Sequence, residues 1–155
     1  PDAVKQSWED IKAAEKAQKG KLPNSLLEDV PRTLPGLSRA VKLQKRAAKV
    51  GFDWQEAAPI FDKLEEELTE LKDAITAQNQ DNIEEEYGDM LFVMANLARH
   101  LKLDPETAIR RGNHKFSNRF KWMEDESKAQ NKLLSDLSLD QLEDLWRKAK
   151  LNLKS

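Results

Sequence analysis

The amino-acid sequence predicts an all-α protein. Only 5 Gly and 6 Pro occur among 155 residues, which argues against a loop-rich or all-β chain. Apolar residues recur at the spacing of a helical face, and no stretch of useful length alternates as a strand would. Hydrophobic residues make up 39% of the chain, which is enough for a core at this length. We therefore expect a bundle of about four core helices with further helices at the ends.

The first 36 residues are predicted to be an N-terminal helix and a linker. Residues 1–20 form a polar helix pattern with Trp8 and Ile11 as its few anchors. Three prolines fall within the thirteen positions that follow residue 22, so 21–36 is expected to be an irregular connector. The main domain is predicted to cover residues 37–155.

The first three helices of that domain follow from apolar spacing and from turn residues. A helix is predicted over 37–50, with Gly51 as its C-terminal stop. The next is predicted over 59–77, and a polar turn over 78–82 separates it from a third helix that ends at about Leu101. The short turn makes the second and third helices antiparallel neighbours.

Two further helices are marked by their starting residues. Asp104 followed by Pro105 is a helix cap with a first-turn proline. Residues 124–135 are polar and are expected to be loose. Ser138 with Gln141 forms a capping box for the last helix.

Composition excludes several classes of protein and site. The net charge is −2, which does not suggest a binder of nucleic-acid polymers. The chain has no Cys, so disulfides, zinc-thiolate sites and thiol nucleophiles are excluded. No apolar run approaches the ~18 residues of a membrane span, and no signal peptide is visible, so a cytoplasmic protein without a membrane partner is predicted.

Charge is distributed unevenly along the chain. Residues 62–89 hold 11 acidic side chains against Lys63 and Lys72, a local net charge of −9. Residues 110–121 hold five basic side chains and no acidic one. The chain therefore carries one acidic and one basic segment, and each requires an explanation.

The acidic side chains share one phase on two adjacent helices. At 100° per residue, Glu67 and Glu86 lie about −60°, and Glu70 and Asp89 about −120°, from the first apolar residue of their helix. Flanks of the same hand meet in an antiparallel pair, so these four carboxylates are predicted to converge, whereas Glu66 points roughly opposite. Crowded carboxylates repel one another unless a cation neutralises them, and oxygen ligands select Mg²⁺ or Mn²⁺. A solvated acidic face is the alternative.

The basic segment shows a similar arrangement. Lys115 and Arg119 form an i,i+4 pair on one flank of the predicted helix, which suits phosphate oxygens. A solvated flank is the alternative explanation of the pair. Asn113 falls near the apolar stripe of this helix and is expected to be buried and hydrogen-bonded.

These residues resemble the MazG superfamily, whose members are all-α nucleoside triphosphate pyrophosphohydrolases. Glu66-Glu67-Leu68-Thr69-Glu70, followed after fifteen residues by Glu86-Tyr87-Gly88-Asp89, matches the family signature EExxE…ExxD. Further similar segments lie at residues 49–54, 88–92, 96–100, 113–120 and 145–150. The resemblance runs from about Trp8 to Lys150. Its details favour the C-terminal, catalytic half of a bacterial MazG, and a first residue that is Pro rather than Met suits a truncation.

The resemblance implies Mg²⁺-dependent hydrolysis of an NTP or dNTP to the monophosphate and pyrophosphate, broad in base, by a cytoplasmic enzyme. It implies that the acidic residues of the signature are catalytic and that four of them hold Mg²⁺, with Mn²⁺ as a possible substitute. These metal ligands are Glu67, Glu70, Glu86 and Asp89, while the role of Glu66, as a base or a supporting group, stays open. The implied substrate contacts are Lys63, Lys115, Arg119, Trp146 and Lys150. Trp146 could instead be a core residue, and Lys63 could merely offset the acids.

Two other functions remain open at this point. One is a pyrophosphohydrolase of narrower substrate range, of the dUTP or dCTP type. The other is a non-catalytic helical module that uses its acidic face for ion binding or dimerisation.

A homodimer is also predicted, because the 83–101 helix is apolar nearly all round. Leu91 and Phe92 fall outside the stripe that faces the acidic partner helix. Phe92 is the best single candidate for an interface, with a contact inside the chain, to the 37–50 helix or the C-terminal helix, as the alternative.

Overall fold

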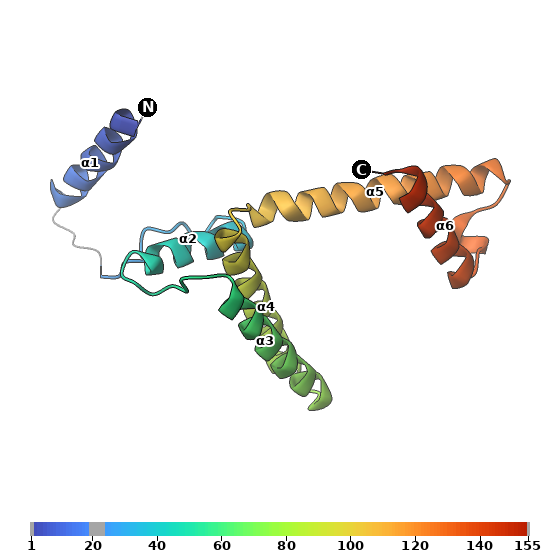
Figure 1. Cartoon of the computed structure of the whole chain (residues 1–155), viewed down its shortest axis with the longest axis horizontal. Helices are drawn as coiled ribbons and strands as arrows, with labels where there is room; N and C mark the ends of the chain where they lie inside the picture. Colours follow the sequence, from blue (N-terminus) through green and yellow to red (C-terminus); the bar gives the residue numbers. More distant parts are fainter. Residues whose placement is uncertain (1, 19–23, 155) are drawn as a thin grey trace. The chain divides into compact units, whose positions relative to one another are not determined.

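The computed structural model describes residues 2–18 and 24–154 and is helical throughout that part of the chain (Figure 1). It contains no strand in the described residues, which confirms the predicted all-α class. None of its described helices is both long and apolar enough to cross a bilayer. The elements are α1 (Asp2–Gln18), α2 (Gly36–Ala48), α3 (Ala58–Thr76), α4 (Gln80–His100), α5 (Pro105–Ala129), the 3₁₀ helix η1 (Leu134–Asp136) and α6 (Leu139–Asn152).

The chain divides into two compact units, residues 1–101 and 102–155. Trp8 and Ile11, the predicted anchors of the first helix, are both exposed on α1. From residue 24 to Pro35 the chain forms turns and irregular structure, as the clustered prolines predicted for this part of the connector. Helix α2 ends two residues before its predicted end, and Gly51 follows in the left-handed region with φ of +86°, which glycine adopts at little cost.

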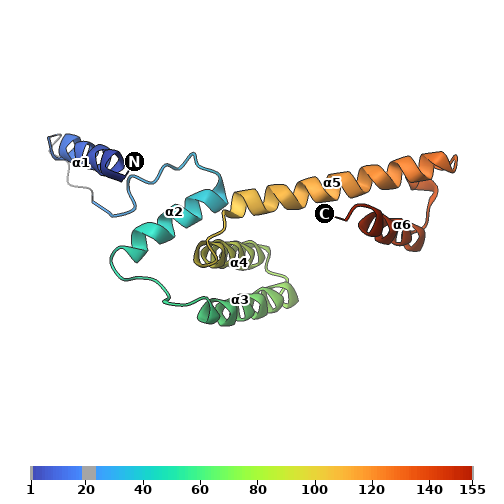
Figure 2. The same ribbon diagram turned by 45° about the horizontal axis from the view of Figure 1, so that its top comes forward.

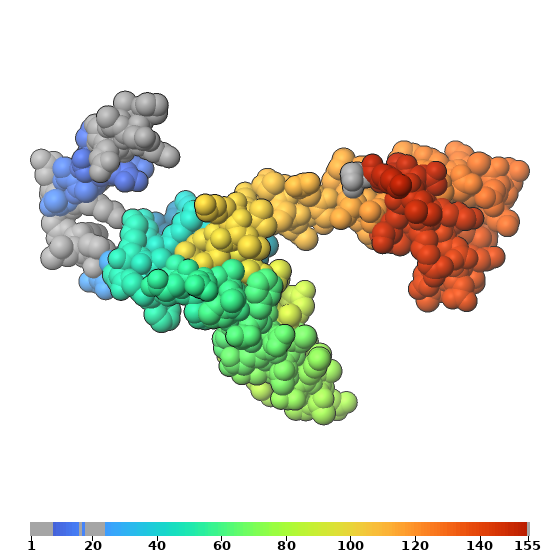
Figure 3. Space-filling model, viewed as in Figure 1, coloured from blue at the N-terminus to red at the C-terminus, as the bar shows by residue number. Residues whose placement is uncertain are grey.

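The centre of the first unit is the antiparallel hairpin of α3 and α4, which lie side by side in both ribbon views (Figures 1 and 2). In the space-filling view the atoms of the two helices adjoin without a gap on the visible face (Figure 3). Ile60, Val93 and Leu97 form the buried core, and Ala57 and Leu64 pack against it. Helix α2 lies on α4, where Gln44 Nε2 donates a hydrogen bond of 2.9 Å to the Phe92 carbonyl.

The turn between α3 and α4 is shorter than predicted. Helix α4 begins at Gln80, because the side chain of Asn79 caps it by accepting a hydrogen bond of 3.2 Å from the Asn82 amide. Gln78 takes a positive φ of 53° to make the reversal. The short turn keeps the two acidic helices adjacent along their whole length.

A partly exposed ion-pair cluster ties the loop between α2 and α3 to the end of α4. Arg99 donates two hydrogen bonds to the carboxylate of Asp53, and His100 Nε2 lies 3.1 Å from Asp53 Oδ1. The Arg99 guanidinium also donates to Asn96 Oδ1, at 2.8 and 3.2 Å. These contacts fix the loop that leads directly into α3. Asp53 is 46 positions from Arg99 and 47 from His100, and sequence periodicity carries no signal for such contacts.

In the second unit α6 packs beside the C-terminal half of α5 (Figures 1 and 2). Met123, Leu145 and Ala149 form the buried core of this unit. Both predicted caps are confirmed. Asp104 accepts a hydrogen bond of 3.0 Å from the Glu106 amide, and Ser138 and Gln141 form the reciprocal capping box at the start of α6. The two caps start α5 and α6.

The prediction of a loose segment at 124–135 is wrong. Helix α5 continues to Ala129, and residues 134–136 form η1. Ser127 is 3% exposed, and its hydroxyl donates a hydrogen bond of 2.9 Å to the Lys132 carbonyl. Ser127 is the buried residue of this segment, and its hydrogen bond to Lys132 holds the turn at the end of α5, although the segment is polar and mostly exposed.

The apolar stripe on the earlier part of α5 is largely exposed, including Ile109, Phe116 and Phe120. The prediction that Asn113 is buried is therefore wrong, since Asn113 is exposed as well. The stripe has the predicted period, but burial depends on what lies against it.

Candidate metal centre

The α3–α4 hairpin brings three of the four predicted carboxylates together. One oxygen each of Glu67, Glu70 and Glu86 lies within 4.8 Å of the other two. Glu67 is buried, with 4% of its surface exposed, whereas Glu86 is half-buried and Glu70 is exposed. The matched helical phases thus place these three side chains at one edge of the hairpin.

The other two acidic residues of the signature lie outside this group. Asp89 is exposed, yet its charge is close enough to raise the pKa of Glu86. Glu66 is not part of the group of three; its side chain is 56% exposed, and its Oε1 lies 3.1 Å from Lys63 Nζ. Asp89 therefore flanks the cluster and Glu66 lies on its outer side.

Burial and the repulsion between neighbouring carboxylates dominate the electrostatics at Glu86. Burial raises the pKa of the Glu86 carboxyl, and the charge of Glu70 and a hydrogen bond with Glu70 raise it further. One oxygen of Glu67 and one of Glu86, Oε2 in both residues, is buried without a hydrogen-bond partner. Buried polar atoms normally have partners, so these two oxygens suit a ligand, and a hard divalent cation is the ligand that carboxylate oxygens favour.

Lys63 lies against the outer side of the cluster. Its Nζ is 2.7 Å from Glu67 Oε1 and 3.1 Å from Glu66 Oε1. The hydrogen bond to Glu67, followed by the one to Glu66, raises the pKa of Lys63 above its ordinary value. Lys63 is therefore a charged partner of Glu67 in this structure.

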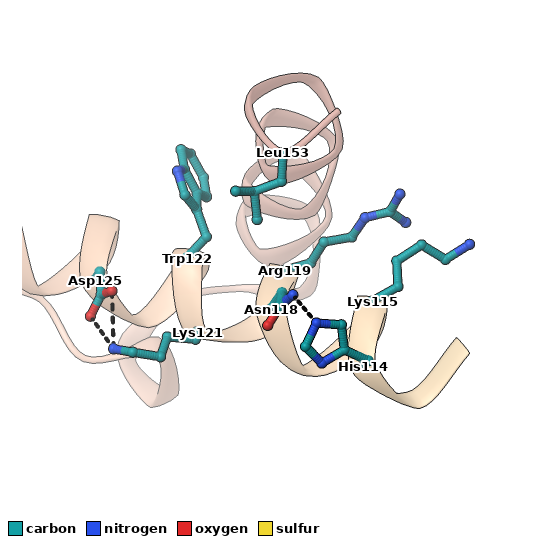
Figure 4. Close-up of a pocket in the computed structure, with 8 residues that line it drawn as sticks. All are labelled: His114, Lys115, Asn118, Arg119, Lys121, Trp122, Asp125 and Leu153. Atoms are coloured by element: carbon teal, nitrogen blue, oxygen red, sulfur yellow. Dashed lines mark hydrogen bonds and ion pairs between the residues drawn. The ribbon is translucent and has the colours of Figure 1, made fainter. Parts of the chain in front are cut away.

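The predicted basic residues lie in the second unit. Lys115 and Arg119 line an open hollow of about 380 Å³ on α5 (Figure 4). The other lining residues are His114, Asn118, Lys121, Trp122, Asp125 and Leu153. In Figure 4, Lys121 reaches Asp125, with which it forms an ion pair at 3.1 Å, whereas Lys115 and Arg119 extend away from that pair. Lys115 and Arg119 thus have no acidic partner among the residues drawn.

The two remaining predicted residues lie on α6. The guanidinium of Arg119 lies over the ring of Trp146, 5.4 Å from its centroid, and Phe116 contacts the same ring. Trp146 is half-buried and packs against the core of the second unit, so it has a structural role. Lys150 is exposed one turn further along α6.

An all-α fold in which carboxylates from two antiparallel helices converge is typical of helical proteins that hold a divalent cation. Residues 55–123 match the MazG nucleotide pyrophosphohydrolase domain. The chain therefore carries a domain of the MazG family, which confirms the resemblance seen in its signature residues.

Relatives extend this similarity beyond the matched domain. The chain is 43% identical over 143 residues to the nucleoside triphosphate pyrophosphohydrolase/pyrophosphatase MazG of Thermotoga maritima. This match covers 92% of the present chain and 54% of that protein. It is 42% identical over 147 residues to the nucleoside triphosphate pyrophosphohydrolase of Escherichia coli K12, with the same coverage. The chain thus spans about half the length of these curated relatives.

A solved structure is also similar. The crystal structure of a mazG-related protein from Thermotoga maritima superposes with a TM-score of 0.52 at 28% sequence identity. The match covers 73% of this chain and 97% of that chain. Helical architecture and sequence therefore agree on the family.

Proposed function

We propose that this chain hydrolyses nucleoside triphosphates between the α- and β-phosphates, releasing the monophosphate and pyrophosphate. The observation that carries the proposal is the convergence of Glu67, Glu70 and Glu86 with two buried, unpaired oxygens. The MazG domain and the names of the Thermotoga maritima and Escherichia coli relatives support this reaction. We propose further that the chain acts on both NTPs and dNTPs and accepts a broad range of bases.

The donor set of the cluster fits Mg²⁺, with Mn²⁺ as a substitute. Glu67, Glu70 and Glu86 would hold the ion, and we propose Asp89, whose charge acts on Glu86, as the fourth ligand. When bound, such an ion polarises a phosphoryl oxygen and lowers the pKa of the attacking water. Glu66 lies on the outer side of the cluster, where its contact with Lys63 favours the supporting role among the two predicted for it.

Other residues are proposed to bind the substrate on the strength of the family resemblance. Lys115 and Arg119 would neutralise charge on the departing pyrophosphate. Their place at an open hollow supports this, because both side chains line a space that an anion can enter. Trp146 and Lys150 are proposed to contact the base or sugar, although the packing of Trp146 also gives it a structural role.

The test is an incubation with Mg²⁺ and each of the eight common nucleoside triphosphates, followed by separation of the products. AMP and pyrophosphate from ATP are expected, and ADP with phosphate would contradict the proposed position of cleavage. Turnover of dUTP or dCTP alone would select the narrower hydrolase. No turnover with Mg²⁺ or Mn²⁺ would favour a non-catalytic helical module. Chelation with EDTA is the control for metal dependence.

We also propose that the chain functions as a homodimer through α4. Tyr87, Leu91, Phe92 and Met94 on this helix are each 43–57% exposed. Phe92 contacts α2 through its carbonyl, while its side chain remains 44% exposed, so the contact inside the chain does not cover it. These side chains lie on more than one side of α4, and such exposed apolar groups are stabilised when a second copy covers them.

Light scattering should report about twice the chain mass of 17.8 kDa. Phe92→Glu should lower that mass, whereas Asp73→Lys, a change of charge at an exposed position of α3, should not. A parent chain that stays monomeric at tens of micromolar, with full activity, would rule out the dimer. The cytoplasmic location stays a prediction.

A further inference from the structure

Lys63 forms an ion pair with Glu67, the most buried carboxylate of the acidic cluster. Glu67 is a carboxylate with 4% of its surface exposed, on the same helix as Glu70 and facing Glu86. Lys63 is one turn earlier on α3, and its side chain is 33% exposed, so its charged end reaches Glu67 from the solvent side. Among the described residues, Lys63 is the one cation in ion-pair contact with the cluster.

A buried carboxylate without a partner strongly destabilises a folded protein, because it loses its hydration and gains nothing in return. Two further carboxylates at this edge of the hairpin add repulsion to that cost. Lys63 offsets both effects with a contact of 2.7 Å. The hairpin therefore tolerates a preformed cluster of acids before any metal ion arrives.

The contact uses only one of the two oxygens of Glu67. Lys63 holds Oε1, while Oε2 is buried and has no hydrogen-bond partner. Glu67 can therefore keep Lys63 on one oxygen and offer the other to a metal ion. Displacement of the lysine is not required.

We propose that Lys63 is a positioning residue of the metal centre: it neutralises and orients Glu67 through Oε1, and it leaves Oε2 to the divalent cation. This inference rests on the proposed metal-binding role of the cluster. It assigns Lys63 a role on the metal side of the site, besides the substrate contact that the family resemblance implied.

The test compares thermal unfolding of the full chain with and without Mn²⁺, in the absence of nucleotide. Lys63→Met keeps the length of the side chain and removes its charge. For a compact unit of about this size, the Tm of the metal-free variant should fall by roughly 5 °C or more. Saturating Mn²⁺ should restore most of that loss, because the ion supplies the missing positive charge. The Mn²⁺-induced rise in Tm should thus be larger in Lys63→Met than in the parent.

Two single variants serve as controls. Lys63→Arg keeps the charge within reach of Glu67, and it should restore the metal-free Tm and the Mn²⁺ response of the parent. Lys72→Met removes an exposed lysine from the same helix. It should leave both quantities unchanged.

A double variant identifies the partner. Lys63→Met with Glu67→Gln removes both charges of the pair, so its metal-free Tm should recover relative to Lys63→Met alone. Lys63→Met with Glu66→Gln should not recover, since Glu66 is exposed and needs no buried counter-charge. If Lys63→Met does not fold without metal, folding on addition of Mn²⁺ and folding of the Glu67→Gln double variant support the proposal.

Three results would contradict this inference or the proposed function on which it rests, and each can be told from the others. A Lys63→Met chain with the metal-free Tm and Mn²⁺ response of the parent would overturn the inference, and a loss confined to nucleotide affinity would return Lys63 to a substrate contact. A parent chain whose Tm does not respond to Mn²⁺ would instead refute the metal centre of the proposed function.

Discussion

The cluster of Asp53 with Arg99 predicts a large effect for a small substitution far from the carboxylates. Asp53→Asn removes the negative charge but keeps the size of the side chain and one acceptor oxygen. Asp53 receives two hydrogen bonds from Arg99 and contacts His100, and its side chain is 24% exposed. The substitution thus weakens the side-chain contacts that tie Asp53, in the loop before α3, to the end of α4.

The magnitude follows from the number and kind of these contacts. A hydrogen bond to a charged group contributes about 1.5–3 kcal/mol to the free energy of unfolding. Because Asp53 is partly exposed and Asn keeps one acceptor oxygen, we expect the substitution to lower that free energy by about 1.5 kcal/mol. For a compact unit of 60–100 residues, that loss lowers the Tm by roughly 6–12 °C. Asp125→Asn is the matched control, since its pair with Lys121 is largely exposed, and exposed pairs contribute at most about 1 kcal/mol.

The effect should depend on pH with a definite sign. The hydrogen bonds from Arg99 hold the pKa of Asp53 below its ordinary value of 3.8. The stabilisation is therefore fully present above that ordinary value and is lost as the pH falls through the lower pKa of the folded state. The parent should approach the variant in stability in acid, whereas the two should differ most at neutral pH.

Thermal unfolding followed by far-UV circular dichroism measures the loss of stability. Limited trypsin digestion, which cleaves after Lys49 at the start of the loop, reports release of the loop itself. Equal Tm values for the Asp53→Asn variant and the parent at pH 7, with equal rates of cleavage at Lys49, would refute this reasoning.

Two further predictions concern one residue in each compact unit. Burial, followed by the charge of Glu70, raises the pKa of Glu86, so the metal-free chain should be more stable at mildly acidic pH than at neutral pH. Glu86→Gln should weaken this pH dependence and keep the metal-free Tm at pH 7 at least as high as in the parent. It should also weaken Mn²⁺ binding, measured by titration calorimetry. A clearly lower metal-free Tm would contradict the prediction. Met123 is 4% exposed in the core of α5 and α6, and Met123→Ala should cost about 2–5 kcal/mol in urea unfolding. An unchanged urea midpoint would mean that this core contributes little to stability.

Local features of the chain were predictable because they depend on neighbours within one helical turn. Asp104 and Ser138 start their helices wherever those helices lie, since a cap bonds only to its own first turn. The helical angles of Glu67 and Glu86 follow from the same regularity. A short turn then made the two helices adjacent, so the convergence of their carboxylates was predictable before any coordinates were known.

Predictions failed where the outcome depended on packing between segments distant in sequence. Residues 124–129 are polar, yet they are helical because Ser127 lies under the segment that leads to α6. Asn113 lies on the apolar side of its helix but is exposed, because that part of the helix has little against it. The same period therefore produced a buried face in one place and an exposed face in another.

The sequence by itself determined the helices, their caps and the common phase of the acidic side chains, because each is set by a repeat of about 3.6 residues and by local hydrogen bonds. Only the tertiary structure decided which charges meet. It paired Asp53 with Arg99, left Asp89 in solvent, and placed Lys63 on one oxygen of Glu67 while leaving the other oxygen free. The physical reason is that burial and charge pairing depend on distances of a few ångströms in space, and helical periodicity specifies only direction around an axis.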